Sequence, residues 1–306
     1  MPRALFPNPK VFLEAARAHQ RDWVTKHLRV ILPDPIRVTL PVTAATEGKN
    51  FFPAPAVREA VVSRFPAAFA LNASGCPGSL AADALRSAHI PFNLFAPLRD
   101  YLGTPQLAQF VALLSSRHLA AVSDIGFEFA DPRARHAIRD NTSFDAYLLA
   151  NSAGPHNTRG PDIFLGVEVK YTEGPYSWTR RERQRMFARN DTYHRVTVSS
   201  GLFRDGAALA LRTRHLKQMW RNMLLGAETA RATHTEFIYL HLYPEGNVYQ
   251  AAACSRFAEH LTPKGRGVFR PTTYERFLDD ASEALPADAL LWIEYLRSRY
   301  LVPGSS

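Results

Sequence analysis

An acidic and a basic residue lie two positions apart in an apolar stretch, GVEVKYTEG, at residues 166–174. Side chains alternate between the two faces of a β-strand. Glu168 and Lys170 would therefore share one face, while the neighbouring valines and tyrosine share the other and can pack on a core. The stretch predicts a carboxylate and an ammonium group that project together, either as a surface ion pair or as half of a site.

A second carboxylate comes from the preceding apolar stretch, SFDAYLLAN, which carries Asp145 near its start. The pattern predicts an antiparallel hairpin that joins residues 143–150 to residues 163–173. In such a hairpin the start of one strand lies beside the end of the other. We therefore expect Asp145 to lie close to Glu168 and Lys170, so that two carboxylates and one ammonium group converge.

This set of groups fits a metal-dependent phosphodiesterase. Two carboxylates can hold Mg²⁺, a hard cation that prefers oxygen ligands and keeps several waters. The backbone carbonyl of Val169 lies between the two charged side chains and offers one further ligand. A bound cation holds the scissile phosphate and lowers the pKa of a water. Lys170 could orient that water or stabilise the developing negative charge.

The dipeptide Pro161-Asp162 offers a competing carboxylate. It lies on the same predicted strand as Glu168, and six extended residues span roughly 20 Å. One ion cannot bridge that distance. We therefore prefer Asp145 and expect Asp162 to be a loop or turn acid.

Asp145 followed by Glu168-Val169-Lys170 resembles the motif of the PD-(D/E)xK nuclease superfamily, the restriction-endonuclease-like fold. Phe144 stands where the motif has proline, a position that is often relaxed in the superfamily. The longer stretches TSFDAYLL, IFLGVEVKYTEG, FNLF, RNMLL and RSRYL are similar to a bacterial restriction endonuclease branch of it. The resemblance covers most of the chain.

The resemblance implies a core of a helix, three strands, a helix and a further strand. It also implies Mg²⁺-dependent hydrolysis of phosphodiester bonds, with Mn²⁺ as a substitute. Asp145 and Glu168 would be the metal ligands and Lys170 the catalytic lysine. In parts of the superfamily a glutamine on the following helix supports the site, and Gln218 occupies such a helix. The alternative for Gln218 is ordinary polar surface.

Two further acids are weaker candidates for the site. Glu128 alternates with Phe127 and Phe129 on the strand before Asp145, and it could hold a second metal ion or a water. Glu173 follows the Glu-x-Lys motif and otherwise reads as an acid at the end of a strand.

A basic segment, WTRRERQRMFARN, follows the predicted active-site strand. Arginines bind phosphates well, so the segment could contact the backbone of a nucleic acid. The alternative is a solvated basic face. The net charge of +9 also favours a polyanionic partner. The candidate contacts are Arg180, Arg181, Arg183, Arg185 and Arg189.

The elements that must position these residues can be read from periodicity and proline placement. Segments 120–130, 143–151 and 163–173 predict an antiparallel three-strand meander, and 236–244 predicts a fourth strand. Residues 87–98 read as extended and 131–142 as a polar connection. The predicted helices span residues 11–28, 54–65, 105–119, 178–191, 205–232, 271–285 and 287–301. This order indicates an α/β or α+β fold, a central mixed sheet flanked by helices.

The composition is that of a globular protein, with 46% hydrophobic and 21% charged residues among 306. Two cysteines without ligand spacing make a zinc site improbable and suit a reducing cytoplasm. The start MPRALFPNPK lacks a signal peptide's apolar region, and no apolar run reaches the length of a membrane span. No GxSxG, GxGxxG or Walker A motif occurs.

Together these features predict a cytoplasmic Mg²⁺-dependent endonuclease acting on DNA, with a restriction or defence role implied only by the resemblance. We expect one nuclease-like domain over residues 1–306, with its core at about 92–245 and additions at 1–91 and 246–306. The alternatives are a weak or inactive nucleic-acid-binding protein of the same fold, or a nuclease acting on RNA. Cutting both strands often uses two active sites, which would favour a homodimer.

Overall fold

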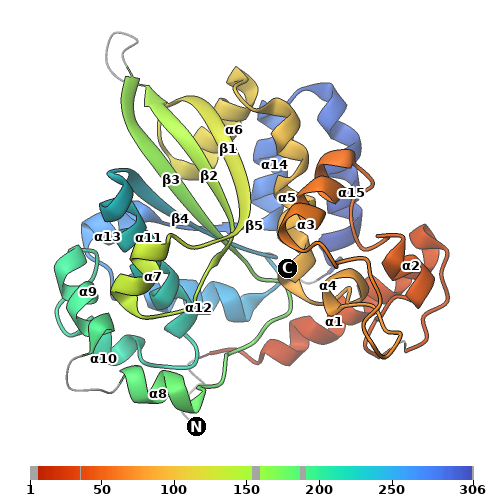
Figure 1. Ribbon diagram of the computed structural model, residues 1–306, viewed down its shortest axis with the longest axis horizontal. Helices are drawn as coiled ribbons and strands as arrows, with labels where there is room; N and C mark the ends of the chain where they lie inside the picture. Colours follow the sequence, from red (N-terminus) through yellow and green to blue (C-terminus); the bar gives the residue numbers. More distant parts are fainter. Residues whose placement is uncertain (1–5, 35, 154–158, 187–190, 305–306) are drawn as a thin grey trace.

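The computed structural model of the chain describes residues 6–34, 36–153, 159–186 and 191–304, and its centre is a five-strand mixed sheet (Figure 1). The strands lie in the order β1-β2-β3-β4-β5. The first three form the antiparallel meander that the sequence predicts, and β4 and β5 add in parallel to β3. The strands are β1 (Leu119–Phe129), β2 (Phe144–Ala153), β3 (Arg159–Val169), β4 (Glu236–Tyr243) and β5 (Phe269–Thr273).

Helices precede, interrupt and follow the sheet. Those before it are α1 (Pro9–Trp23) with the π-helical turn η1 (Val24–Leu28), α2 (Val42–Thr46), α3 (Pro55–Arg64), α4 (Ser79–Ala82), η2 (Ser87–His89), α5 (Ile90–Phe95), η3 (Pro97–Tyr101) and α6 (Pro105–Ser115). Those between strands are α7 (Pro132–Ile138), α8 (Arg180–Met186), α9 (Thr192–Ser200), α10 (Ala207–Leu211), α11 (Lys217–Thr233), α12 (Val248–Glu259) and α13 (Pro263–Val268). The chain continues with α14 (Tyr274–Ala284), η5 (Ala287–Ala289) and α15 (Leu290–Tyr300).

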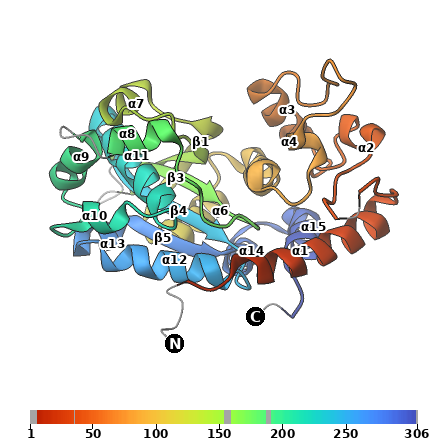
Figure 2. The ribbon, with the colours of Figure 1, turned by 90° about the horizontal axis from the view of Figure 1, so that it is seen from below.

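The two faces of the sheet are covered by different helices, which gives the α/β fold that the sequence predicts. On one face, Val167 and Val169 of β3 join an apolar cluster with α5, α6, α14 and α15. On the other face, Phe237 and Tyr239 of β4 pack with Trp220 of α11 and with residues of α7, α9 and α12. Figure 2 shows α1 and α15 side by side, in the part of the molecule that also carries α2, α3 and α4. Among the described helices, none combines the length and apolar character needed to cross a membrane.

A glycine lets α11 approach the sheet closely. A Cβ atom built on Gly226 would lie 1.8 Å from the Phe237 ring of β4, where no side chain fits. This close contact fixes the depth of α11 and with it the position of Asn222, which lies one helical turn before Gly226 on the same side.

A buried arginine joins the last helix to the N-terminal part of the chain. Arg299 of α15 has no exposed surface and donates to the Asn50 carbonyl at 3.0 Å. Its backbone carbonyl accepts a bond from His19 of α1 at 3.1 Å. Trp292 of α15 donates to the Asn93 carbonyl at 2.7 Å. Residues from both halves of the chain therefore complete one packing unit.

Two segments differ from the sequence predictions because proline starts a short helix as readily as it ends one. Residues 87–98, predicted to be extended, form η2, α5 and the start of η3, with Pro91 and Pro97 in first turns. The predicted connection 131–142 contains α7, with Pro132 in its first turn. The Asp131 carboxylate caps this helix, accepting from the Arg133 amide at 2.8 Å.

The predicted helix 205–232 is two helices, because the chain leaves α10 at Leu211 and starts again at Lys217. Thr213 lies in the break and accepts bonds from the amides of Leu216 and Lys217. Leu209 of α10 is 76% exposed. The helices α9, α12 and α13 and the strand β5 are further elements that the sequence reading missed.

Candidate active site

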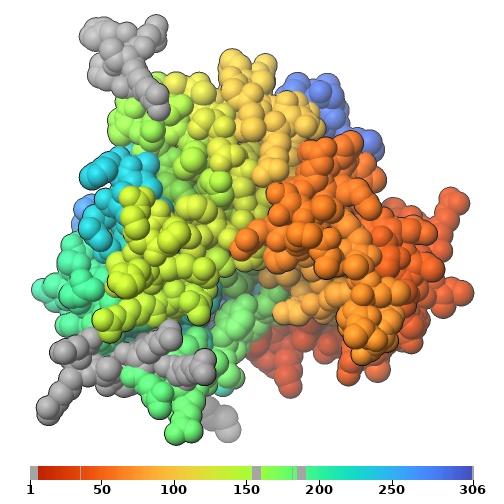
Figure 3. Space-filling model, in the orientation of Figure 1, coloured from red at the N-terminus to blue at the C-terminus, as the bar shows by residue number. Residues whose placement is uncertain are grey.

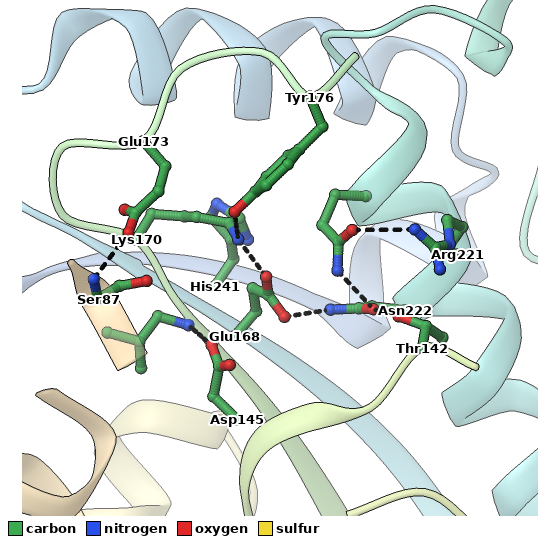
Figure 4. Close-up of polar contacts among 12 residues, drawn as sticks. Ser87, Thr142, Asp145, Glu168, Lys170, Glu173, Tyr176, Arg221, Asn222 and His241 are labelled. Carbon is green, nitrogen blue, oxygen red and sulfur yellow. Dashed lines mark hydrogen bonds and ion pairs between the residues drawn. The ribbon is translucent and has the colours of Figure 1, made fainter. Parts of the chain in front are cut away.

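The pairing of β2 with β3 brings Asp145 next to the Glu-x-Lys strand. Ala146 pairs with Val167, so the preceding residue of β2 lies opposite Glu168. The Val169 amide donates to Asp145 Oδ2 at 2.7 Å (Figure 4). Asp162, in contrast, pairs with Asn151 near the other end of the hairpin, where its Oδ1 accepts an amide bond at 2.7 Å.

Glu168 and Lys170 form a buried ion pair on the face covered by α11. Their residues are only 3% and 5% exposed. Lys170 Nζ contacts Glu168 Oε1, and Asn222 Nδ2 of α11 donates to Glu168 Oε2 at 2.5 Å. Removing two charges from water is costly unless each finds partners. Here both oxygens of the glutamate are satisfied by groups from two different elements.

Lys170 is held as a cation in spite of its burial. Burial is the largest single effect and acts to lower the pKa of Lys170, but the charges of Glu168, Tyr176 and Asp145 together outweigh it. The pKa of Lys170 is therefore raised well above its usual value. The Tyr176 hydroxyl lies 3.2 Å from Nζ, and the ring centroid lies 4.9 Å from it. The ammonium group is charged and fixed in direction.

Asp145 lies beside a group of like charge, because its neighbour Glu168 is also a carboxylate. Burial and then the charge of Glu168 raise the pKa of Asp145 well above its usual value. Lys170 and the Val169 amide oppose this rise only in part, and Glu128 adds to it. Negative charge thus exceeds positive charge around Asp145, which favours binding of a cation.

The side chains that hold Glu168 form a network on α11. Thr142 donates to Asn222 Oδ1 at 2.9 Å, and Gln218 Nε2 donates to the same oxygen at 3.3 Å. These two donors orient the Asn222 amide so that its nitrogen points to Glu168 (Figure 4). Arg221 follows on the same helix and donates to Asp140 with two nitrogens, at 2.5 and 2.9 Å.

A histidine pairs in register with Glu168 but is not available as a base. His241 of β4 is 1% exposed, and burial followed by the charge of Lys170 lowers its pKa to about 3. Its ring nitrogens lie 3.1 Å from the Tyr239 hydroxyl and 3.3 Å from Gln250 Oε1. His241 therefore supports the strand as a neutral ring at physiological pH.

Asp145, Glu168 and Lys170 open onto a cavity of about 470 Å³. One wall comes from the segment 85–88 of the N-terminal part, which includes the exposed Arg86. In Figure 3 the orange N-terminal part and the yellow-green residues around 130–145 lie on the same face of the molecule. The remaining lining residues are Asn141, Thr142, Ser143, Thr172, Glu173, Tyr176, Gln218 and Arg221.

The weaker candidates fall into different places. Gln218 lies in the cavity wall and bonds to Asn222, which in turn bonds to Glu168. Glu173 lines the cavity but accepts from the backbone amides of Ser87 and Tyr171 at 2.7 and 2.8 Å, so it anchors the segment 85–88 to the strand end. Glu128 accepts from the Ser143 hydroxyl at 3.0 Å and is not part of the cavity lining.

Of the five arginines in the basic segment, the structure describes the side chains of Arg180 and Arg183, both exposed on α8. Arg181 and Arg185 belong to the same helix, but their side chains, like the whole of Arg189, lie outside the described residues. On this helix Glu182 contacts α11, with Lys217 at 3.0 Å and Arg221 at 3.1 Å.

A comparison with protein-family models matches residues 7–302 to the PD-(D/E)XK nuclease superfamily. The chain belongs to this superfamily. Searches of curated proteins and of solved structures found no match. Membership in the PD-(D/E)XK superfamily supports a nuclease-type activity in general.

The donor set of this superfamily member fits a hard divalent cation. No group of three or more acidic, histidine or cysteine ligands occurs among the described side chains, so the site offers two carboxylates. Asp145 lines the cavity, and its Oδ1 atom accepts no bond from the residues that the structure describes. Mg²⁺ commonly binds through one or two carboxylates and keeps water or phosphate oxygens as its other ligands. The two carboxylates, Asp145 and Glu168, therefore fit a bound Mg²⁺ ion.

Two residues of the site were missed from sequence. Asn222 makes the direct bond to Glu168, whereas the sequence favoured Gln218 on the same helix. Tyr176 carries no signal that links it to Lys170, because the loop between them has no periodic pattern. Only a helix face aligned with the Glu-x-Lys strand could have suggested Asn222.

Proposed function

We propose that this protein is a Mg²⁺-dependent endonuclease that hydrolyses phosphodiester bonds of DNA. The observation that carries the proposal is the meeting of Asp145, Glu168 and Lys170 from β2 and β3 at one cavity. The excess of negative charge around Asp145 supports a cation there. The membership in the PD-(D/E)XK superfamily supports phosphodiester hydrolysis.

Each residue has a role that follows from its contacts. Asp145, Glu168 and the Val169 carbonyl would hold Mg²⁺, and Mn²⁺ can replace it. When bound, the cation supplies a polarised phosphate and an acidified water. Lys170 is charged and held by Tyr176, so it can stabilise negative charge that develops on the phosphate. Asn222 positions Glu168 through its amide.

The substrate would approach from the face that carries the cavity. Arg86 in its wall and the exposed arginines of α8, Arg180 and Arg183, offer phosphate contacts. The net charge of +9 favours long-range attraction of a polyanion. These features support a nucleic acid as the substrate, and DNA is the form that we propose.

A cleavage assay tests this function. Supercoiled plasmid is incubated with Mg²⁺, Mn²⁺, Ca²⁺ or EDTA and with wild type, Asp145→Asn, Glu168→Gln and Lys170→Met. We expect nicking or linearisation by wild type in Mg²⁺ or Mn²⁺ and losses of about a hundredfold or more in each variant. Asp162→Asn is the matched control, because this acid is exposed at the far end of the same hairpin. Equal cleavage by wild type and the three site variants would overturn the proposal.

The same preparation separates the alternatives. A matched RNA cleaved faster than DNA would make the protein a ribonuclease. Salt-sensitive binding of either nucleic acid without cleavage in any divalent ion would make it a binding protein of the same fold.

The wider setting also remains a proposal. We propose that the chain acts as one nuclease-like domain in the cytoplasm, in restriction or defence, and that a homodimer cuts both strands. Sedimentation of the protein with and without a DNA duplex tests the dimer: a constant monomer mass in both samples would contradict it.

A further inference from the structure

A second cavity lies beside the active site, at the C-terminal end of α7. It also measures about 470 Å³, and its lining consists of Arg135, His136, Arg139, Asp140 and Asn141. Two of these residues are arginines and one is a histidine, against a single acid. The cavity is therefore basic unless that acid neutralises it.

Asp140 is already neutralised by a residue from another helix. Arg221 of α11 donates to both of its carboxylate oxygens, at 2.5 and 2.9 Å, and the Thr142 amide donates at 2.6 Å. A carboxylate engaged in a bidentate pair has little charge left for other cations. Asp140 therefore offsets little of the positive charge that lines the cavity.

The C-terminal end of a helix carries partial negative charge, which disfavours an anion unless nearby cations offset it. Three of the last four carbonyls of α7 accept hydrogen bonds. The Arg139 amide donates to the carbonyls of Arg135 and His136, and Arg195 of α9 donates to the Ala137 carbonyl at 3.4 Å. Arg195 is exposed and adds a further cation at this end of the helix.

Arg135 lines the cavity, and a hydrogen bond holds its guanidinium in place. Its terminal nitrogen donates to the Asn141 carbonyl at 2.9 Å. Its Nε atom is buried and has no hydrogen-bond partner among the described residues. Because this Nε atom is inaccessible, an anion in the cavity would contact the other nitrogens of the guanidinium.

The second cavity is continuous with the site along the chain. Asn141 lines both cavities, and Asp145 follows four residues later. Four extended residues span about 13 Å. Successive phosphates of one strand advance by about 3.4 Å along a duplex axis. Phosphates of one strand that are a few nucleotides apart can therefore reach both cavities.

We propose that Arg135, His136 and Arg139 form a second phosphate subsite, which takes a backbone phosphate of the nucleic acid whose scissile bond lies at Asp145, Glu168 and Lys170. This inference rests on the proposed function for its substrate. The subsite at the end of α7 would fix the position of the nucleic-acid strand relative to the cleavage site.

Binding in EDTA tests the subsite without any cleavage. Fluorescence anisotropy measures the Kd of labelled DNA and RNA duplexes of one sequence at several salt concentrations. Arg135→Gln/Arg139→Gln should raise Kd about tenfold and reduce the slope of log Kd against log salt by about 1 to 2. Arg133→Gln is the matched control, since it lies on the same helix but pairs with Asp131 at 3.1 Å. It should change Kd less than about twofold.

The outcomes separate this inference from the proposed function. Weaker binding by the double variant than by Arg133→Gln supports the subsite even if wild type cleaves nothing. The duplex that wild type binds more tightly, DNA or RNA, shows which nucleic-acid backbone the subsite takes. Equal Kd and slope for the double variant and the control overturn the subsite even if wild type is an active nuclease. Absence of binding by wild type overturns it as well. If the double variant does not fold, Arg139→Gln alone, at an exposed position, gives the same comparison.

Discussion

The side-chain amide of Asn222 donates to Glu168 Oε2 at 2.5 Å, across the interface between α11 and β3. The other oxygen of the same glutamate contacts Lys170. The direction of the carboxylate is therefore set from two sides, by its own strand and by a helix more than fifty residues later in the chain. The site depends on how α11 lies on the sheet as much as on the motif.

Asn222→Ala should lower kcat about tenfold, because it removes one of the two groups that fix Glu168. Binding of DNA in EDTA should be unchanged, since Asn222 does not line the cavity. Steady-state cleavage and anisotropy measure the two quantities. Gln218→Ala is the control: it leaves the Asn222–Glu168 bond in place and should change kcat less than about threefold. A larger loss from Gln218 than from Asn222 would show that the glutamine carries the support.

Glu168→Gln and Lys170→Met should each lower the free energy of unfolding by about 3–5 kcal/mol, because each leaves the other buried charge without its partner. The double variant should lose less than the sum of the two by at least about 1 kcal/mol. Urea denaturation without divalent ions measures all four proteins. Strict additivity would mean that the two charges do not interact in the folded protein.

Gly226→Ala should destabilise the protein by about 1–3 kcal/mol, because the new methyl group would overlap the Phe237 ring. It should also slow cleavage, since α11 would move away from β4 and carry Asn222 with it. Thermal denaturation and the cleavage assay measure these effects. Phe237→Leu in the Gly226→Ala background should recover part of the loss.

Gly267→Ala is the matched control for Gly226. It also lies in a helix, α13, but an added Cβ there meets no atom within 4 Å. Unfolding should be unchanged or slightly more difficult. A similar loss at both glycines would point to a general effect of helix substitution and against the close approach of α11.

His89 should make the protein acid-sensitive. It is 1% exposed, and burial followed by the charge of Arg299 lowers its pKa well below the usual value. The unfolded chain therefore binds a proton below about pH 6.5 that the folded protein does not. Stability falls as pH drops, by up to about 1.4 kcal/mol per pH unit for this group. Denaturation between pH 5 and 7 measures the slope.

His89→Phe should reduce the slope of unfolding free energy against pH by up to about 1.4 kcal/mol per pH unit, which corresponds to one proton. The matched control is Phe51→Leu, whose ring lies 6.3 Å from the His89 ring and which carries no titratable group. It should lower stability by a similar amount at every pH. An acid slope that persists unchanged in His89→Phe would assign the effect to other groups.

The meander and the meeting of its charged residues were predictable because both follow from local alternation. A period of two residues fixes which side chains share a face, and a hairpin fixes which ends lie together. Asp145 and Glu168 therefore come together without any knowledge of the rest of the fold. Asp162 could be excluded as a ligand of the same ion because the rise per residue of a strand places it too far from Glu168.

The contacts of Asn222 and Tyr176 were not predictable, because they depend on packing between distant segments. Nothing local to α11 tells which of its polar residues faces β3, and Gly226 acts only through its contact with Phe237. The short helices α5 and α7 were missed for another reason. Their prolines read as breaks, whereas each one starts a turn whose stability comes from tertiary contacts.

The bonds from Arg299 to Asn50 and from Trp292 to Asn93 have a consequence for how the protein is made. On a ribosome, residues 50 and 93 emerge long before their partners in α15. Until about residue 300 has left the exit tunnel, the early segment lacks the bonds that α15 donates, and the apolar surface that α15 covers stays exposed. The nascent chain therefore needs α15 to complete this packing, and a polypeptide that ends before α15 should aggregate.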